Sequence, residues 1–318
     1  MSVDTRKIIF IGGCPRSGTT LLASMLGSPE SHLAIPEMDI KFRLLGGLTG
    51  EGEQLSRLQI LKLIRQQLKL WDINKSLSTL DSVFPDQNHI RSILDWIILY
   101  YSREKYPKRE HSVWIEHDPE NIKVVQSLLR IYPEAKFVYI LRDGRAVANS
   151  ALKLPWGPNS VVRSAEWWLT YLGFGFSAMH AYQGRQLFML RYEDLVFHTR
   201  ETLAAICSIC QLNFSESMIH GTGFKVPDHL KRSHNLIGSP PDPSRVTAWK
   251  KELTARQIEL FEWVTKDVLS YLGYELIYGN NVRPPNLREK TAYHTKEWIY
   301  ELKHRIFRSL KNVYNVKI

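Results

Sequence analysis

The sequence predicts an α/β fold in which helices flank a parallel β-sheet. Short apolar runs alternate along the chain with longer segments of helical periodicity, a pattern typical of sheets covered on both faces. The first apolar run leads into a Gly-rich bend and then into a helical segment, as in P-loop folds. The 318 residues, 44% hydrophobic and 23% charged, suffice for one large domain with its own core.

The expected elements follow one another in a regular order. A strand is expected at Lys7–Ile11, a helix at Ser17–Gly27, and helices over much of residues 40–105. Further strands are expected within SVWIEHD (112–118), Lys136–Leu141 and QLFMLRYEDL (186–195). Further helices are expected in PENIKVVQSLLRIYP (119–133), from about Arg145, at Ser160–Tyr182 and in TRETLAAICSICQL (199–212). The Pro-rich segment NNVRPPN (280–286) predicts a boundary between a domain at 1–280 and a tail at 281–318.

Composition and charge exclude several classes of protein. The net charge is +10, but nine basic and three acidic residues lie in the tail, which leaves only +4 for the first 280 residues. This nearly balanced domain argues against a nucleic-acid partner. No apolar run is long enough to span a bilayer, and no secretory signal is evident. Three cysteines cannot form a disulfide framework, so a cytoplasmic location is expected, and Cys207–Cys210 lacks a second ligand pair for a metal.

The basic tail has the periodicity of an amphipathic helix. Its apolar residues recur at steps of three and four: Ile299, Leu302, Ile306, Leu310 and Val313. Two interpretations remain open. The helix lies in an anionic membrane interface as a peripheral contact, or its apolar stripe packs against the domain at 1–280.

The Gly-rich bend departs from the nucleotide-triphosphate loop in one respect. Gly13 and Gly18 have the required spacing, but Thr19 and Thr20 stand where Lys-Ser/Thr is usual. A bend between a parallel strand and a helix N-terminus binds anions through backbone N–H groups and the helix dipole. With Arg16 as its only strong cation, the bend fits a terminal group of lower charge than a γ-phosphate, such as a sulfonyl ester.

Two segments resemble a known family. CPRSGTTLL (14–22) followed by LRDGRAVANS (141–150) is similar to the sulfotransferases that use 3′-phosphoadenosine-5′-phosphosulfate (PAPS). The resemblance is to the bacterial and tyrosylprotein-like branch, which also carries RYEDL (191–195), and it spans roughly residues 7–273. It implies a single P-loop-type sulfotransferase domain that uses PAPS and no metal.

The resemblance also implies how the donor is bound. The 5′-phosphosulfate is expected at Arg16, Ser17, Gly18, Thr19, Thr20 and Leu21. The 3′-phosphate is expected at Arg142 and at Ser150, two helical turns further on. Additional donor contacts are expected at Tyr192, His234, Gly238 and Arg245. The alternative for Arg142 is a local ion pair with Asp143, with Ser150 as an exposed helix position.

The catalytic residues follow from the segment LAIPEMDIKF (33–42) and from EHDP (116–119). By resemblance Glu37 is the general base that removes a proton from the acceptor, whereas Asp39 is a bystander. His117 stands where many relatives carry a lysine. Either protonated His117 takes a related role, or Arg16 alone stabilises the bridging oxygen. Trp156 is a candidate acceptor contact.

The expected function is transfer of a sulfuryl group from PAPS to a hydroxyl or amine. The acceptor is a small molecule, saccharide, lipid or peptide. Two alternatives stay open. A P-loop kinase-like phosphotransferase shares the loop but needs the absent lysine and a magnesium-binding Asp pair. A non-catalytic nucleotide-binding protein needs the bend but not Glu37 together with Arg142.

Overall fold

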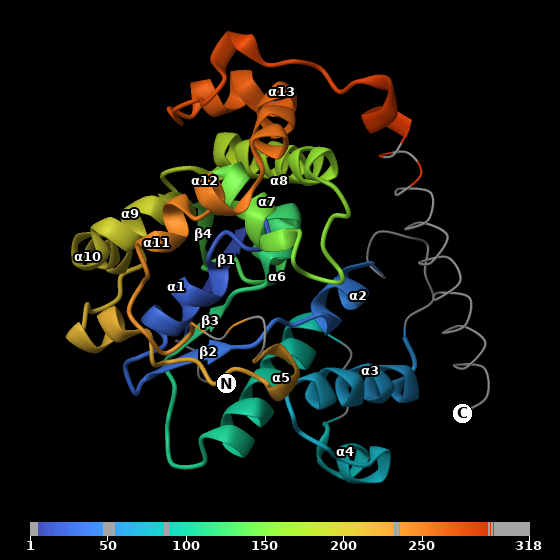
Figure 1. Cartoon of the computed structure of the whole chain (residues 1–318). Helices are drawn as coiled ribbons and strands as arrows, with labels where there is room; N and C mark the ends of the chain where they lie inside the picture. Colours follow the sequence, from blue (N-terminus) through green and yellow to red (C-terminus); the bar gives the residue numbers. More distant parts are fainter. Residues whose placement is uncertain are drawn as a thin grey trace. The chain divides into compact units, whose positions relative to one another are not determined.

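The computed structural model describes residues 6–46, 55–85, 89–231, 234, 236–291, 293 and 295. It contains a five-stranded parallel sheet with the strand order β2-β3-β1-β4-β5, of which Figure 1 labels β1 to β4. The predicted parallel α/β fold is therefore confirmed. The strands are β1 Lys7–Gly13, β2 His32–Ile35, β3 Val113–Glu116, β4 Lys136–Leu141 and β5 Leu187–Arg191.

The helices divide into an early and a late set. Up to β5 they are α1 Thr19–Leu26, α2 Ile40–Gly46, α3 Arg57–Leu70, α4 Leu77–Val83, α5 Ile90–Lys105, α6 Val125–Ile131, α7 Gly144–Ala151 and α8 Val161–Tyr182. After β5 they are α9 Tyr192–Phe197, α10 Thr199–Ile209, α11 Ser244–Thr247, α12 Trp249–Glu252 and α13 Ala255–Tyr271. Short 3₁₀ helices lie at Pro119–Lys123, Glu216–His220, Asp228–Leu230 and Gly279–Asn281.

The chain forms two compact units. Unit 1 holds the whole sheet and comprises the chain up to Leu141 together with Phe174–Asp242. Unit 2 comprises Arg142–Gly173 and the chain from Pro243 onward.

Strands β1 to β4 of unit 1 are buried on both faces, whereas the edge strand β5 is partly exposed. Every residue of β2 and β3, and all but the first residue of β1 and β4, are buried or nearly so. Such continuous burial is the property of parallel strands covered by helices on either side. The register places Ile35 beside Glu116 and Glu116 beside Phe10. The loops after β1, β2 and β3 therefore leave the sheet at one edge, where ligands bind in doubly wound folds.

Helices α2 to α5 form a cluster of their own within unit 1, as Figure 1 shows for α3, α4 and α5. Helix α3 begins with a capping box in which the Ser56 side chain accepts from the Gln59 backbone and the Gln59 side chain returns to Ser56. Its buried residues include Gln67, and its end is marked by buried Trp71. The side-chain N–H groups of Gln67 and Trp71 reach the loop after β2, so this cluster shapes the functional site.

Unit 2 is organised around a buried arginine. Arg145 of α7 binds Asp143 at 2.8 Å and Glu262 of α13 at 2.6 Å, and its guanidinium lies 4.0 Å from the ring centroid of Trp249. A Cβ atom on Gly144 would lie 2.5 Å from the ring of Trp168, so glycine permits this close packing. The arginine thereby ties α7, α12 and α13 together.

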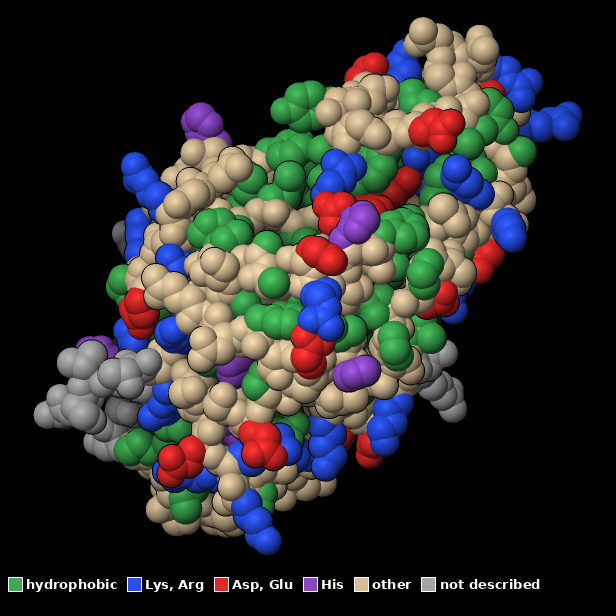
Figure 2. All heavy atoms as spheres, turned by 90° about the vertical axis from the view of Figure 1, so that its left-hand side faces the viewer, with side chains coloured by type: hydrophobic (Ala, Val, Ile, Leu, Met, Phe, Trp, Pro, Cys, Tyr) green, Lys and Arg blue, Asp and Glu red, His purple; other side chains and the backbone are tan. Residues whose placement is uncertain are grey.

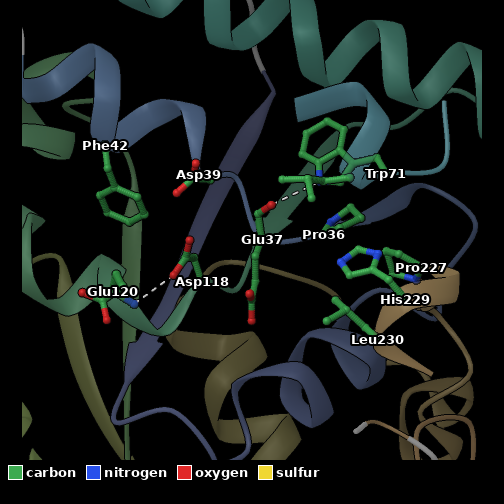
Figure 3. A pocket seen from close by; sticks show the side chains of 11 residues that line it. Pro36, Glu37, Asp39, Phe42, Trp71, Asp118, Glu120, Pro227, His229 and Leu230 are labelled. Atoms are coloured by element: carbon green, nitrogen blue, oxygen red, sulfur yellow. Dashed lines mark hydrogen bonds between the residues drawn. The ribbon is translucent and has the colours of Figure 1, made fainter. Parts of the chain in front are cut away.

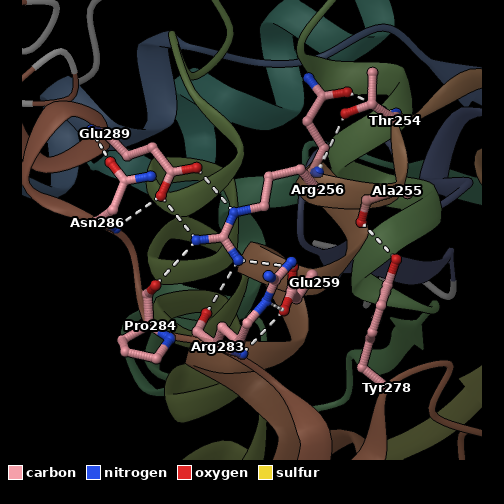
Figure 4. Close-up of polar contacts among 10 residues, drawn as sticks. Thr254, Ala255, Arg256, Glu259, Tyr278, Arg283, Pro284, Asn286 and Glu289 are labelled. Atoms are coloured by element: carbon pink, nitrogen blue, oxygen red, sulfur yellow. Dashed lines mark hydrogen bonds and ion pairs between the residues drawn. The ribbon is translucent and has the colours of Figure 1, made fainter.

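The first residues beyond the predicted boundary at residue 280 bind α13. Figure 4 shows Arg283 at Glu259, with a closest distance of 2.8 Å, and Glu289 at Arg256, with a closest distance of 2.7 Å. The division at residue 280 stays a prediction. The amphipathic stripe from Ile299 onward lies outside the described residues.

Two predicted elements have different boundaries in the structure. The helix expected at 119–133 is broken into a 3₁₀ helix and α6, because the Asn121 amide donates to Ile11 O and Glu116 Oε2 and draws this segment onto the sheet. The strand expected through RYEDL ends at Arg191. Glu193 and Asp194 instead occupy the first turn of α9, where acidic side chains favour a helix N-terminus.

The described residues include no helix with the length and apolar character needed to cross a bilayer. On the face of these residues drawn in Figure 2, basic and acidic side chains are interspersed over short distances.

Candidate functional site

The Gly-rich bend forms an open helix N-terminus. Strand β1 ends at Gly13, the Ser17 N–H donates to Cys14 O at 3.0 Å, and α1 begins at Thr19. Gly18 has φ +104°, a left-handed conformation that favours glycine, and it provides no side-chain cap. The first N–H groups of α1 therefore have no side-chain acceptor from the cap position, and they are suited to an anion.

The side chains of the bend also fit a bound anion. Ser17 is 1% exposed, and its Oγ makes no hydrogen bond to any residue that the structure describes. A buried hydroxyl without a partner is costly unless a ligand satisfies it. Thr19 and Thr20 are buried beside it. Leu21 is half-buried in the first turn of α1, where only its backbone is polar.

Tyr192, one of the residues predicted to contact the donor, lies against the bend. A Cβ atom on Gly18 would lie 2.6 Å from Cδ2 of the Tyr192 ring, well inside van der Waals contact. Tyr192 is 6% exposed and is the first residue of α9, directly after β5. The Tyr192 ring therefore leaves no room for a side chain at position 18, so only glycine fits there.

Gly18→Ala is expected to abolish measurable binding of adenosine 3′,5′-bisphosphate. The methyl group would strain the left-handed backbone and displace the Tyr192 ring. Isothermal titration calorimetry measures the affinity, with Gly184→Ala as the control, since Gly184 also has positive φ but open space around it. Unchanged affinity in Gly18→Ala would show that the bend does not bind the nucleotide.

Glu37 lies in the loop between β2 and α2, and its backbone is held from three sides. The Glu37 carbonyl accepts hydrogen bonds from Gln67 Nε2 and Trp71 Nε1, both at 3.1 Å. The next N–H, that of Met38, donates to Glu116 Oε1 at 3.1 Å. The loop therefore has one well-determined conformation, with the carboxyl of Glu37 directed into a pocket (Figure 3).

A buried charge cluster lies next to this loop. Lys41 is fully buried, and its Nζ binds Glu116 Oε2 at 2.9 Å and Asp118 Oδ2 at 3.3 Å. Glu116 also accepts from Asn121 Nδ2 at 2.7 Å, and Asp118 accepts from the Glu120 N–H at 3.0 Å. Each buried charge in the cluster is thus compensated by an opposite charge or a hydrogen bond.

These surroundings raise the pKa of the Glu37 carboxyl to about 8. Burial is the largest cause, and the negative charges of Asp118 and Glu116 add to it, whereas Lys41 and Arg16 oppose it. The influence of Arg16 is informative because it places the guanidinium of the Gly-rich bend within electrostatic range of Glu37. Arg16 and Glu37 therefore lie in the same part of unit 1.

Burial keeps His117 and His234 neutral near pH 7. Burial lowers the pKa of His117 to about 3, with His234 adding to the effect and a hydrogen bond with the Ile35 backbone opposing it. Burial and Arg16 lower the pKa of His234 to about 4. His117 is 2% exposed and packs edge-on against Phe224. The expectation that His117 acts in its protonated form is not supported by this environment.

A pocket of about 280 Å³ opens beside Glu37. Figure 3 shows Asp39 and Asp118 on one side of Glu37, and Trp71, Pro227, His229 and Leu230 on the other. Asp39, expected to be a bystander, lines the pocket and binds Arg43 at 3.1 Å. The full lining is Pro36, Glu37, Asp39, Phe42, Leu70, Trp71, Asp118, Glu120, Pro227, His229 and Leu230.

Unit 2 holds the residues predicted for the 3′-phosphate. Arg142 directly follows β4 and is 8% exposed; its Nη2 donates to Arg245 O at 2.8 Å, and its carbonyl accepts from Trp168 Nε1 at 3.1 Å. Arg142 and Arg245, both predicted donor contacts, are thus neighbours. Ser150 is half-buried near the end of α7. Trp156, the candidate acceptor contact, is 51% exposed.

Sequence reasoning missed Lys41, Gln67, Trp71 and Asp118. The spacing Glu116-x-Asp118 at the end of a buried strand was a usable signal, because parallel strands end at one edge. Lys41, Gln67 and Trp71 carry no such signal, since α2 and α3 reach the loop only through tertiary packing. Among the described residues no group of three or more His, Cys, Asp or Glu side chains is arranged to hold a metal ion.

Comparison with known proteins identifies the family. The model of the sulfotransferase family matches residues 9–216, so the chain belongs to this family and the expected enzyme class is confirmed. The protein-tyrosine sulfotransferase of Drosophila melanogaster is 24% identical over 302 residues, a match that covers 90% of this chain and 54% of the fly protein. The nodulation protein NoeE of Sinorhizobium fredii is 26% identical, with 84% of this chain and 66% of that protein covered.

Solved structures agree on the fold. The sulfotransferase domain of the curacin biosynthetic pathway superposes with a TM-score of 0.56 at 19% identity and covers 85% of this chain and 99% of its own. The sulfotransferase domain of the Synechococcus PCC 7002 olefin synthase gives 0.58 at 18% identity, with 87% and 98% covered.

Proposed function

We propose that this protein transfers the sulfuryl group of PAPS to a hydroxyl or amine, with Glu37 as general base. The observation that carries the proposal is the Glu37 carboxyl itself. It lies in a pocket, its backbone is fixed by Gln67, Trp71 and Glu116, and its pKa of about 8 responds to Arg16 of the Gly-rich bend. A base of this kind next to an anion cradle is the arrangement that a group transfer to a hydroxyl requires.

The donor is assigned to two sets of residues. Arg16, the buried hydroxyls of Ser17, Thr19 and Thr20, and the first N–H groups of α1 hold the 5′-phosphosulfate. Arg142, Ser150 and Arg245 hold the 3′-phosphate, and Tyr192 contacts the nucleotide next to Gly18. When bound, PAPS supplies the sulfuryl group that the acceptor oxygen or nitrogen attacks.

Glu37 accepts the proton that the acceptor loses as its bond to sulfur forms. A general base is most effective when its pKa lies near the working pH, and about 8 satisfies this condition. Arg16 stabilises the negative charge that develops on the bridging oxygen as the bond to sulfur breaks. His117 is neutral, so in this proposal it contributes no positive charge.

Binding measurements separate the proposal from its two alternatives. Calorimetric titration with adenosine 3′,5′-bisphosphate in EDTA is expected to give tight binding, because the site uses no magnesium. A kinase-like phosphotransferase would instead prefer ATP with magnesium. A non-catalytic nucleotide-binding protein would bind the bisphosphate but would release no labelled product from radiolabelled PAPS with any saccharide, lipid or tyrosyl-peptide acceptor.

Arg142→Ala is expected to weaken binding of the bisphosphate by roughly 10²-fold, and Ser150→Ala by about tenfold or less. The arginine loses a charge-assisted contact to a dianion, whereas the serine loses one hydrogen bond. Calorimetry measures both, with Arg163→Ala as a control because Arg163 pairs with Glu166 on the exposed side of α8. If Arg142→Ala and the native protein bind the bisphosphate with equal affinity, Arg142 does not contact the 3′-phosphate.

A further inference from the structure

We propose that the pocket beside Glu37 selects a positively charged acceptor, an alcohol, phenol or sugar that carries an amine. The inference rests on the proposed function, because it takes the pocket as the acceptor site. It adds the chemical class of the molecule that the pocket binds.

The side chains that line the pocket are one-sided in charge. Glu37 and Asp39 come from the loop after β2, and Asp118 and Glu120 from the loop and 3₁₀ helix after β3. No lysine or arginine is among the described residues that line it. An entering molecule therefore meets four carboxyl groups and no basic side chain other than the imidazole of His229.

The cations that pair with these carboxylates are outside the lining. Lys41 is fully buried between Glu116 and Asp118. Arg43 binds Asp39 at 3.1 Å and Lys123 binds Glu120 at 2.7 Å, but both pairs are partly exposed, so water weakens their mutual attraction. The carboxylates thus retain the capacity to bind an additional positive charge from the pocket side.

The rest of the lining suits the carbon skeleton of such a molecule. Phe42 and Trp71 offer aromatic surface, and Pro36, Pro227 and Leu230 add apolar walls (Figure 3). An aromatic face attracts a cation in addition to its apolar contact. The volume of about 280 Å³ is near the lower end for ligand pockets, which fits a small acceptor or the terminal group of a larger one.

A cationic acceptor also improves the base. The charges of Asp118 and Glu116 raise the pKa of Glu37, and a positive charge in the pocket opposes them as Lys41 and Arg16 do. Binding of the acceptor therefore increases the fraction of Glu37 in the carboxylate form that removes the proton. Recognition and activation are coupled through the same charge.

Three phenols of similar size test the inference: tyramine (positive), 4-ethylphenol (neutral) and 4-hydroxyphenylacetate (negative). Their dissociation constants are measured by calorimetry on the protein saturated with adenosine 3′,5′-bisphosphate. Tyramine is expected to bind roughly tenfold more tightly than 4-ethylphenol, and the anion more weakly than either, as four nearby carboxyl groups imply. Raising the salt concentration should narrow this preference.

Variants of the lining carboxylates test whether the pocket causes the preference for tyramine over 4-ethylphenol. Asp39→Asn combined with Glu120→Gln is expected to reduce the tyramine preference about threefold or more. Glu134→Gln is the control, since Glu134 is a similarly exposed carboxylate paired with Arg91 and does not line the pocket. Glu134→Gln should prefer tyramine over 4-ethylphenol as strongly as the native protein does.

The outcomes distinguish this inference from the proposed function. If the bisphosphate binds but tyramine binds no more tightly than 4-ethylphenol, the inference is wrong while the proposed function stands. If tyramine is preferred but the double variant and Glu134→Gln keep the same preference, the carboxylates of this pocket are not its cause, and the inference is again wrong. Absence of bisphosphate binding contradicts the proposed function itself.

Discussion

Glu37→Gln is expected to lower turnover by about 10²- to 10⁴-fold and to leave the affinity for adenosine 3′,5′-bisphosphate nearly unchanged. The amide keeps the shape of the side chain but cannot accept the proton of the acceptor. The fixed backbone of the loop, held by Gln67 and Trp71, should keep the pocket intact. Turnover with radiolabelled PAPS and calorimetry with the bisphosphate measure the two quantities on the same preparation.

The pH profile provides the matching control. Because the pKa of Glu37 is about 8, log kcat/KM of the native protein should rise with pH and level off above about 8. In Asp118→Asn the rising part of this pH profile should move to lower pH, since the Asp118 charge raises the pKa of Glu37. Glu30→Gln, a change at a highly exposed carboxylate, should leave the rising part of the profile at the same pH. Turnover retained in Glu37→Gln would transfer the base role to another group.

Glu37→Gln, which is expected to lower turnover, is also expected to raise the thermal stability of the protein at high pH. The folded pKa of Glu37 is raised, so the folded state binds more protons than the unfolded state between about pH 4.5 and about 8. Stability from this group is therefore complete below about pH 4.5 and falls as pH rises through the folded pKa of about 8. Glu37→Gln removes this loss, so its melting temperature should exceed that of the native protein at pH 9 but not at pH 4. This difference would also show that the variant is folded.

The features that the sequence predicted are those that depend on local order. The bend at Gly13–Gly18 is contiguous, so its spacing alone predicts an anion cradle between β1 and α1. Continuous apolar strands likewise predict a sheet covered on both faces.

The features that escaped prediction depend on long-range packing. The charge state of His117 is set by burial against Phe224, which lies far along the chain. The acidic pocket brings together residues from four segments, and only Glu37 among them had been singled out as catalytic. The break in the helix expected at 119–133 results from hydrogen bonds of Asn121 to β1 and β3, which helical periodicity does not encode.

Lys41→Met is expected to destabilise the protein by about 3–5 kcal/mol, the largest stability effect that we expect of a single substitution here. Removing the ammonium leaves Glu116 and Asp118 as buried carboxylates with no cation, and Glu116 is fully buried. Urea unfolding at neutral pH measures the free energy, with Lys75→Met as the control because the Lys75–Glu104 pair is partly exposed and should matter little.

A second substitution shows whether the loss comes from charge or from packing. Glu116→Gln in the Lys41→Met background removes one of the two uncompensated charges. Its amide oxygen can still accept from the Met38 N–H, whereas the acceptor of Asn121 Nδ2 is lost. The double variant should therefore regain a large part of the lost stability, although Glu116→Gln alone destabilises the native protein. Lowering the pH should narrow the deficit of Lys41→Met in the same way, since protonation neutralises both carboxylates. A deficit that is independent of both the second substitution and pH would mean that altered packing at position 41, and not the loss of the Lys41 charge, causes the instability.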